Sequence, residues 1–106
     1  MLKREILIKK IIGIADTKYP GSEIYLYGSR ARGNAKGLSD WDLLILLNTR
    51  GVSFELETRL MDDFYELELE TGEILSPLIY SKNDWISKHV FTALYENIQK
   101  EGIRIK

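Results

Sequence analysis

The beginning of the chain changes from a helical to a strand pattern of apolar residues. Over about residues 3–18, apolar side chains recur roughly every three or four positions between lysines, which predicts an amphipathic helix. Tyr19, Pro20 and Gly21 end it, since proline disfavours helical geometry in the preceding residue and glycine permits a turn. Residues 23–27 are rich in β-branched and aromatic side chains and predict a first strand.

The middle of the chain predicts a central strand followed by a helix. Residues 30–39 contain two glycines, one asparagine and one serine, and predict a short helical turn and then a loop. Residues 41–47 are apolar on both faces, so this strand is expected to lie centrally in a covered sheet. A turn over residues 48–51 precedes a helix over about 53–69, where large apolar residues recur at helical spacing.

The remainder predicts a third strand and a helical end. Residues 74–80 form the strand, in which Pro77 favours an edge position or a bulge because proline cannot donate to a sheet. Residues 81–84 resemble a helix start, and residues 89–100 predict a last helix that is closed by Gly102. The order of helices and strands predicts an α/β fold with about three or four strands.

Length and composition narrow the class of protein. The 106 residues are expected to form a single domain, because chains rarely divide into separate cores below about 150 residues. Fifteen basic and sixteen acidic residues leave a net charge of −1, which argues against a dedicated nucleic-acid binder. The sequence has no cysteine for a disulfide, a thiolate nucleophile or a zinc site. Its apolar stretches are too short to span a membrane and its start does not resemble a signal peptide, so we expect a cytoplasmic protein.

The clearest chemical pattern lies at the end of the first strand. Gly28 and Ser29 turn the chain into a short helix, which would expose backbone N–H groups and a hydroxyl to a phosphate group. Gly28 allows the backbone to approach an anion closely, and Ser29 can donate to a phosphate oxygen. Arg30 and Arg32 lie in the same turn, and phosphate contacts and surface charge are equally good interpretations of both.

Asp40 and Asp42 begin the second strand two positions apart, so both side chains point to one face. Two converging carboxylates repel each other unless a cation lies between them, and hard oxygen ligands suit Mg²⁺ or Mn²⁺ held jointly with substrate phosphates. The pair therefore predicts a metal site that takes ATP or another nucleoside triphosphate. In the alternative interpretation, Asp40 caps a turn and Asp42 pairs with an arginine of the preceding turn.

The two segments together resemble a known family. Ten residues separate Ser29 from Asp40, so the pattern is Gly-Ser-x10-Asp-x-Asp. It resembles the signature of the DNA polymerase beta-like nucleotidyltransferase superfamily, and its compact form over residues 28–44 resembles the minimal nucleotidyltransferase branch. The resemblance implies a nucleotidyltransferase fold, with a small mixed sheet flanked by helices. It also implies that Gly28 and Ser29 bind the triphosphate and that Asp40 and Asp42 are catalytic metal ligands.

A third carboxylate on a later strand usually completes the site in this superfamily. The strand over residues 74–80 contains no aspartate, and Glu73 at its head is the best candidate for this catalytic and metal-ligating position. Glu73 shares a strand face with Leu75, and the sequence leaves open whether that face carries the aspartate pair. A solvated acid at a strand end is the alternative interpretation of Glu73.

The resemblance also implies a function. The expected reaction transfers a nucleoside monophosphate, in the first place AMP, from the nucleotide to a hydroxyl of a partner protein. Small members of this branch often pair with a helical HEPN protein as the antitoxin of a toxin–antitoxin system, so a HEPN-type partner is expected, without direct contacts to membrane or nucleic acid. Two rivals stay open: a non-catalytic module that neutralises a partner by contact, and transfer to a small molecule.

Several residues outside this motif are given structural roles. Trp41 and Trp85 are expected to pack in the interior rather than stack on a base. His89 lies in a predicted helix without a visible partner, so no catalytic role is expected for it. The acidic run over residues 62–70 is interpreted as a solvated helix face, and its alternative roles are to repel nucleic acid or to receive a basic partner.

Overall fold

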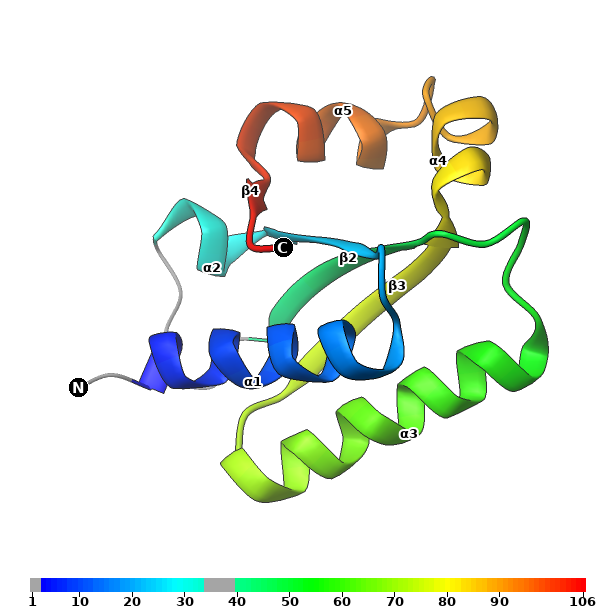
Figure 1. The fold of residues 1–106 in the computed structure, drawn as a ribbon. Coiled ribbons are helices and arrows are strands. Elements are labelled where there is room, and N and C mark those ends of the chain that lie inside the picture. The colour runs from blue at the N-terminus through cyan, green and yellow to red at the C-terminus, as the bar shows by residue number, and fades with distance from the viewer. Residues whose placement is uncertain (1–2, 34–39) are drawn as a thin grey trace.

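The computed structural model describes residues 3–33 and 40–106. In this part of the chain, helices surround a single four-stranded sheet with the strand order β3-β2-β1-β4 (Figure 1). The elements in chain order are α1 (Lys3–Lys18), β1 (Glu23–Tyr27), α2 (Ser29–Arg32), β2 (Trp41–Leu47), α3 (Phe54–Thr71), β3 (Leu75–Ser81), α4 (Lys82–Lys88), α5 (Ala93–Glu101) and β4 (Ile103–Arg104).

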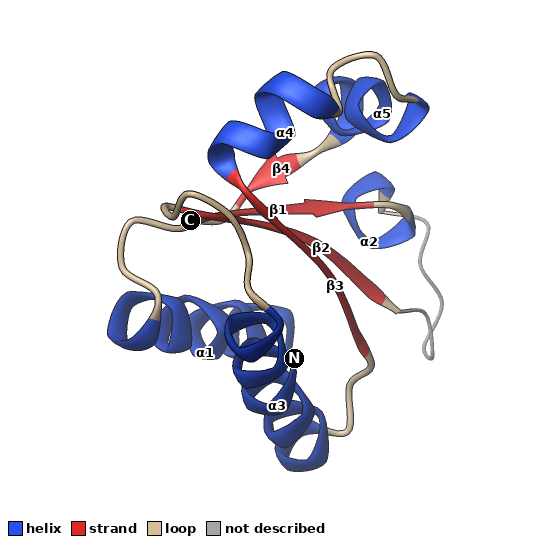
Figure 2. Cartoon of the chain, turned by 90° about the vertical axis from the view of Figure 1, so that its right-hand side faces the viewer, coloured by secondary structure: helices blue, strands red, loops and turns tan. Residues whose placement is uncertain are grey.

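The sheet is mixed and covered on both faces. β1 runs antiparallel to β2 and to β4, whereas β2 runs parallel to β3. Helices α1 and α3 lie on one face, and α4 and α5 lie on the other (Figure 2). The expected α/β fold with a small mixed sheet flanked by helices is confirmed.

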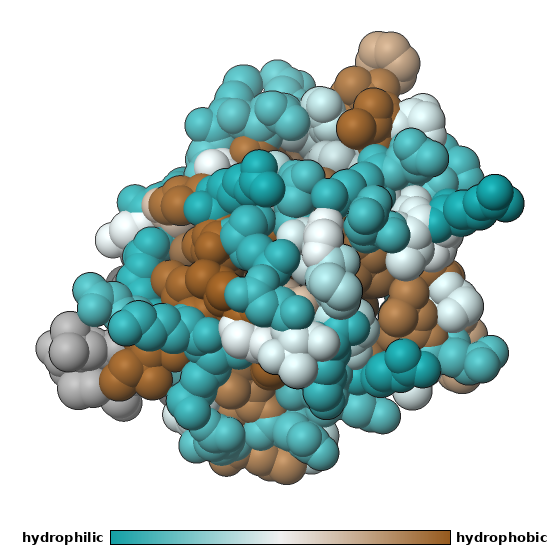
Figure 3. Space-filling model, viewed as in Figure 1, coloured by the Kyte–Doolittle hydropathy of each residue, from teal (hydrophilic) through white to brown (hydrophobic). Residues whose placement is uncertain are grey.

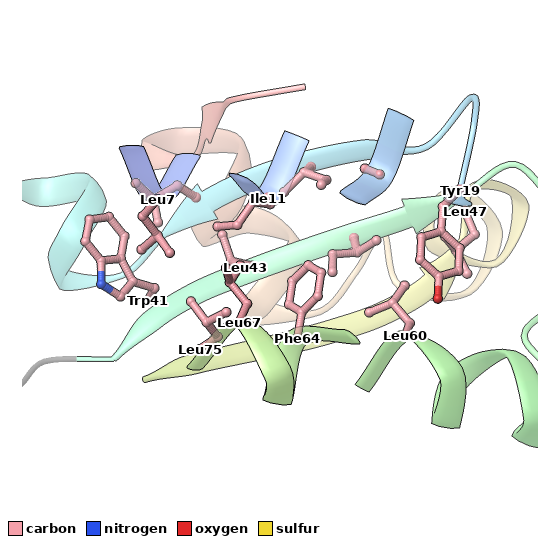
Figure 4. Close-up of a cluster of buried hydrophobic side chains, with 14 residues drawn as sticks. Leu7, Ile11, Tyr19, Trp41, Leu43, Leu47, Leu60, Phe64, Leu67 and Leu75 are labelled. Carbon is pink, nitrogen blue, oxygen red and sulfur yellow. The ribbon is translucent and has the colours of Figure 1, made fainter. Parts of the chain in front are cut away.

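Strand β2 holds the two layers together, because its side chains alternate between two apolar cores. Leu43, Ile45 and Leu47 pack under α1 and α3 in the larger core (Figure 4), which also contains Leu7 and Phe64. Full burial of a large apolar side chain is worth about 1.5–3 kcal/mol, so this core supplies much of the stabilisation. Because β2 packs against an apolar core on each side of the sheet, it is apolar on both faces and lies inside the sheet, as its sequence predicts.

The smaller core lies between the sheet and the pair α4–α5. Leu44 and Leu46 of β2 pack there against Trp85 of α4 and Ile98 of α5. Three aromatic side chains, Tyr80, Trp85 and Tyr95, extend this core, and His89 packs its ring 4.3 Å from that of Tyr80. This second core fixes α4 and α5 over the sheet face that also carries Asp42.

The register of the strands places the start of β2 between two other strand ends. Tyr27, the last residue of β1, pairs with Asp42. On the other side, Ser76 of β3 pairs with Asp42. Three side chains that are distant in the sequence therefore meet at one end of the sheet.

Most of the predicted elements are confirmed with small shifts at their ends. The first helix and the first two strands have the predicted bounds, and Pro77 lies in an edge strand. The predicted helix over residues 89–100 is wrong at its start, because α5 begins only at Ala93. The Thr92 hydroxyl accepts a hydrogen bond from the Tyr95 N–H at 3.1 Å and caps a new helix, so residues 89–91 form a turn.

None of the described helices is long and apolar enough to cross a bilayer.

Candidate functional site

The loop after β1 requires glycine at position 28 for two reasons. Gly28 has a φ of 74°, in the left-handed region where side chains are strained. A Cβ atom added to Gly28 would collide with the Oδ2 atom of Asp42. The Gly28 carbonyl accepts from the N–H groups of Ala31 and Arg32, both at 3.1 Å, and so starts α2. The backbone of the Gly28–Ser29 loop therefore lies directly against the carboxylate of Asp42.

Asp40 and Asp42 form the negative end of this site. Asp40 is exposed, whereas Asp42 is half-buried between β1 and β3. Burial first, and then the charge of Asp40, raise the pKa of Asp42, while Arg32 acts to lower it. The structure brings the two carboxylates close enough to repel each other, which is the condition under which a divalent cation is favourable.

Ser76 is a third polar side chain of the site, which the sequence pattern alone did not reveal. Its hydroxyl donates a hydrogen bond to Oδ2 of Asp40 at 2.9 Å. Ser76 alternates with the core residue Leu75 along β3 and so lies on the same sheet face as the aspartate pair. The alternation of side chains along the strand places Ser76 on the face opposite Leu75. The register of β2 and β3 is also needed to place Ser76 beside the aspartates.

Tyr27 forms a wall of the site beside Asp42. Burial first, and then the charge of Asp42 and the neighbouring Tyr80, raise the pKa of Tyr27 to about 12. Its phenol is therefore neutral at physiological pH and can act as a hydrogen-bond donor. The sequence pattern identified Tyr27 only as the last residue of a strand and did not indicate that it belongs to the site.

The two arginines of α2 have different surroundings. Arg32 is the cation near Asp42, and its Nη1 atom also contacts Oε1 of Glu101 in α5 at 3.0 Å. The Arg30 guanidinium instead lies over the Trp41 ring, 4.4 Å from its centroid. Of the two, Arg32 is thus the one whose charge acts on Asp42.

The structure does not bring Glu73 to the aspartate pair. Its Oε1 atom accepts a hydrogen bond from the Trp41 indole N–H at 2.8 Å and lies 3.7 Å from Nη2 of Arg30. Trp41 alternates with the aspartates along the chain and is buried in the core under α1, as its sequence pattern predicts. Among the described residues, no three His, Cys, Asp or Glu side chains form a group that could hold a metal ion.

The remaining candidates take structural positions. Trp85 is buried in the interior, as predicted, and packs with Tyr80. His89 has partners that were not foreseen, since its ring stacks on Trp85 and lies tilted against Tyr80. The acidic run of α3 is only partly solvated. Asp63 within it accepts from Tyr19 and Lys18, each at 2.8 Å.

The site therefore combines a tight backbone loop, two carboxylates, one hydroxyl and one nearby guanidinium. Such a set of oxygen ligands suits a hard divalent cation, and the Gly28 loop lies directly against it.

Comparison with known families assigns the chain to a family. The family model of the nucleotidyltransferase domain matches residues 8–104, so the chain belongs to the nucleotidyltransferase domain family, within the polymerase beta-like superfamily. The search of curated proteins returned no match.

Solved structures with the same fold include two of toxin–antitoxin proteins. One is a toxin–antitoxin with AMP-PNP, with a TM-score of 0.69 and 19% identity over 93% of this chain and 72% of that one. The other is a mutant of the toxin–antitoxin MntA-HpeT, with a TM-score of 0.64 and 20% identity over 91% of this chain and 68% of that one. At these identities the likeness establishes the fold.

Proposed function

We propose that this chain transfers a nucleoside monophosphate, AMP in the first place, from a nucleoside triphosphate to a hydroxyl group of a partner protein. In this reaction the hydroxyl oxygen forms a bond to the α-phosphorus, its proton is released, and pyrophosphate leaves. The observation that carries the proposal is the contact between the Gly28 loop and Asp42, since it joins a phosphate-binding backbone to a carboxylate pair.

Each residue of the site has a role in the proposal. Ser29 and the loop backbone bind the triphosphate, and Arg32 adds positive charge next to it. Asp40 and Asp42 hold Mg²⁺ or Mn²⁺, which when bound would neutralise the carboxylates and the phosphate oxygens together. Ser76 keeps Asp40 oriented through its hydrogen bond. Glu73 and Arg30 hold Trp41 in place on the opposite face of the sheet and so support the strand that carries Asp42.

The proposed partner is a helical protein of the HEPN type, in a toxin–antitoxin pair with this chain as the antitoxin. Two structures with this fold come from toxin–antitoxin proteins, one of them with a nucleotide analogue, which supports the proposal.

Nucleotide binding is tested by thermal unfolding. ATP with Mg²⁺ is expected to raise the melting temperature, and ATP with EDTA is expected to leave it unchanged, since a ligand at about a hundredfold excess over its Kd stabilises by about 2.7 kcal/mol. Asp40→Asn with Asp42→Asn should remove the metal-dependent part. Asp62→Asn with Glu66→Gln on α3 removes two acids far from the site and is the matched control. An equal shift in EDTA would exclude the metal site.

Transfer is tested on the complex with the co-expressed protein of the neighbouring gene. ATP radiolabelled at the α-phosphate should label the partner, and the Asp40→Asn and Asp42→Asn variant should abolish labelling. Glu73→Gln keeps an oxygen acceptor for Trp41 and should label as the wild type does. A tenfold loss in Glu73→Gln, with intact ATP binding, would instead make Glu73 the third carboxylate.

A non-catalytic binding module is the second candidate. The engagement of Glu73 with Trp41 favours it, because no third carboxylate joins the aspartate pair among the described residues. A wild-type complex that forms and neutralises the partner without labelling it would support this candidate over the enzyme.

A further inference from the structure

Helix α3 has a second apolar face that points away from the protein. Phe54, Met61, Tyr65 and Leu69 are 81%, 45%, 59% and 69% exposed. They are spaced by seven, four and four residues, so they line one side of the helix over most of its length. The apolar surface is visible at the lower edge of the molecule in Figure 3, where Figure 1 shows α3. We call these four residues the α3 outer stripe.

The outer stripe is separate from the face that stabilises the fold. The inner face of α3 is provided by Leu60, Phe64 and Leu67, which are buried in the larger core. None of the four stripe residues belongs to either core of the described structure. Single exposed apolar residues are ordinary, but an aligned set on one helix marks a surface that is covered by another molecule.

Acidic residues border the outer stripe. α3 carries seven acidic side chains and one basic one, whereas the whole chain has a net charge of only −1. Three of the acids are used within the protein: Asp63 binds Lys18, Glu70 binds Lys10, and Glu68 accepts from the N–H of Leu75. At 100° per residue, the exposed Glu55, Asp62 and Glu66 follow one edge of the stripe and Glu57 follows the other.

We infer that the α3 outer stripe is the docking surface for a helix of the partner protein, with apolar side chains on one side flanked by lysine or arginine. The inference rests on the proposed function only in that this chain works together with a partner. An apolar stripe between acidic edges is complementary to such a helix, because the apolar residues supply contact area and the charges set orientation. The alternative role of the acidic run, to receive a basic partner, is thereby given a defined surface.

Charge decides against the other occupants. Two copies of α3 packed against each other would bring their acidic edges together, which is unfavourable. Nucleic acid and anionic membrane surfaces carry the same sign of charge as the stripe edges.

The direct test measures binding of two synthetic helical peptides by fluorescence anisotropy. Each has about 21 residues with leucine at the a and d positions of three heptads, and the e and g positions hold lysine in one and glutamate in the other. The lysine peptide should bind at least about tenfold more tightly than the glutamate peptide, and its affinity should fall with added salt. Equal affinity for the two peptides would overturn the inference.

Variants of the protein distinguish binding by the apolar stripe from unspecific attraction between the lysine peptide and the acidic side chains. Tyr65→Ser with Leu69→Ser leaves every charge in place and should weaken binding of the lysine peptide by at least about tenfold. Phe91→Ser is the matched control, because Phe91 is 99% exposed in the turn between α4 and α5, and it should change the affinity by less than about twofold. Unchanged affinity in the stripe variant would overturn the inference.

The same proteins distinguish this inference from the proposed function. The stripe variant should keep the full Mg²⁺-dependent stabilisation by ATP, since Tyr65 and Leu69 are exposed and belong to neither core of the described structure. Loss of nucleotide binding with intact peptide binding would reject the proposed function alone. Sedimentation equilibrium of the free chain should show a monomer, and a dimer that dissociates in the stripe variant would assign the stripe to a second copy and overturn the inference.

Discussion

At the scale of single residues, the side chain at position 76 determines whether a third carboxylate joins Asp40 and Asp42. It is the register partner of Asp42 and donates to Asp40, so a longer acidic side chain at this position would reach the same pair. A hydroxyl orients a carboxylate without adding charge, whereas a third carboxylate would add a ligand for metal together with further repulsion in its absence.

Replacement of Ser76 tests this role. Ser76→Asp is expected to lower the Mn²⁺ concentration needed for half-maximal stabilisation by ATP by about tenfold, and to destabilise the metal-free protein by about 1 kcal/mol through like-charge repulsion. Ser76→Ala should raise the required Mn²⁺ concentration, since Asp40 loses its hydrogen bond. Both are measured by thermal unfolding over a metal titration. Ser87→Asp, an exposed serine on α4, is the control, and an identical response of both aspartate variants would contradict the assigned position of Ser76.

At the scale of elements, the turn from β1 into α2 depends on the absence of a side chain at position 28. Gly28 has a positive φ and lies against Asp42, while Gly33 at the other end of α2 has a φ of 77° and nothing within 4 Å of an added Cβ. A substitution at either glycine therefore has a similar backbone cost, and only a substitution at Gly28 adds a collision with the carboxylate of Asp42.

This difference gives a prediction with an internal control. Gly33→Ala should destabilise the protein by about 1 kcal/mol, the cost of a left-handed alanine. Gly28→Ala should cost about 1–3 kcal/mol more and abolish metal-dependent ATP binding, because Asp42 has to move. Chemical denaturation of both variants and of Gly28→Ala with Asp42→Ala measures the coupling. Removal of the Asp42 side chain should recover part of the stability, and strictly additive effects would show that the collision is absent.

At the scale of the whole molecule, a partly buried hydrogen bond connects the end of α1 to α3. The hydroxyl of the buried Tyr19 donates to Oδ2 of Asp63 at 2.8 Å. Burial first, and then the bond to Asp63, raise the pKa of Tyr19 above its usual range. The folded protein therefore keeps the Tyr19 proton at a pH where the unfolded chain has released it.

This linkage predicts a loss of stability in alkali. Tyrosine in the unfolded chain titrates near pH 10, so the contribution of Tyr19 is fully present below that pH and is lost as the pH rises toward the folded pKa. Each retained proton steepens the fall by about 1.4 kcal/mol per pH unit. Tyr19→Phe should cost about 1.5–3 kcal/mol at about pH 7 and show a shallower decline between about pH 10 and pH 11 in urea denaturation. A parallel decline in both proteins would assign the alkaline loss to other groups, such as Tyr25.

The sequence by itself determined the elements and the heart of the candidate site. Helices and strands follow from the spacing of apolar residues, because a helix or strand repeats its environment every few positions. The pairing of Asp40 with Asp42 was predictable for the same reason, since alternate residues of a strand share a face. The family resemblance associated the Gly28–Ser29 loop with the aspartate pair, but the direct contact of Gly28 with Asp42 comes from the pairing of β1 with β2.

Only the tertiary structure decided which distant residues complete the site and which faces remain open. Ser76 joins Asp40 through the register of two parallel strands, and no local pattern specifies a register between segments more than thirty residues apart. Glu73 binds Trp41 rather than the aspartates because it emerges on the opposite face of the sheet from Ser76. The same holds for α3: its sequence contains two apolar faces, and packing against the sheet selects the one with Leu60 and leaves the one with Tyr65 exposed. Contacts that close only when the chain is folded depend on all elements at once, and this is why they cannot be read from any one segment.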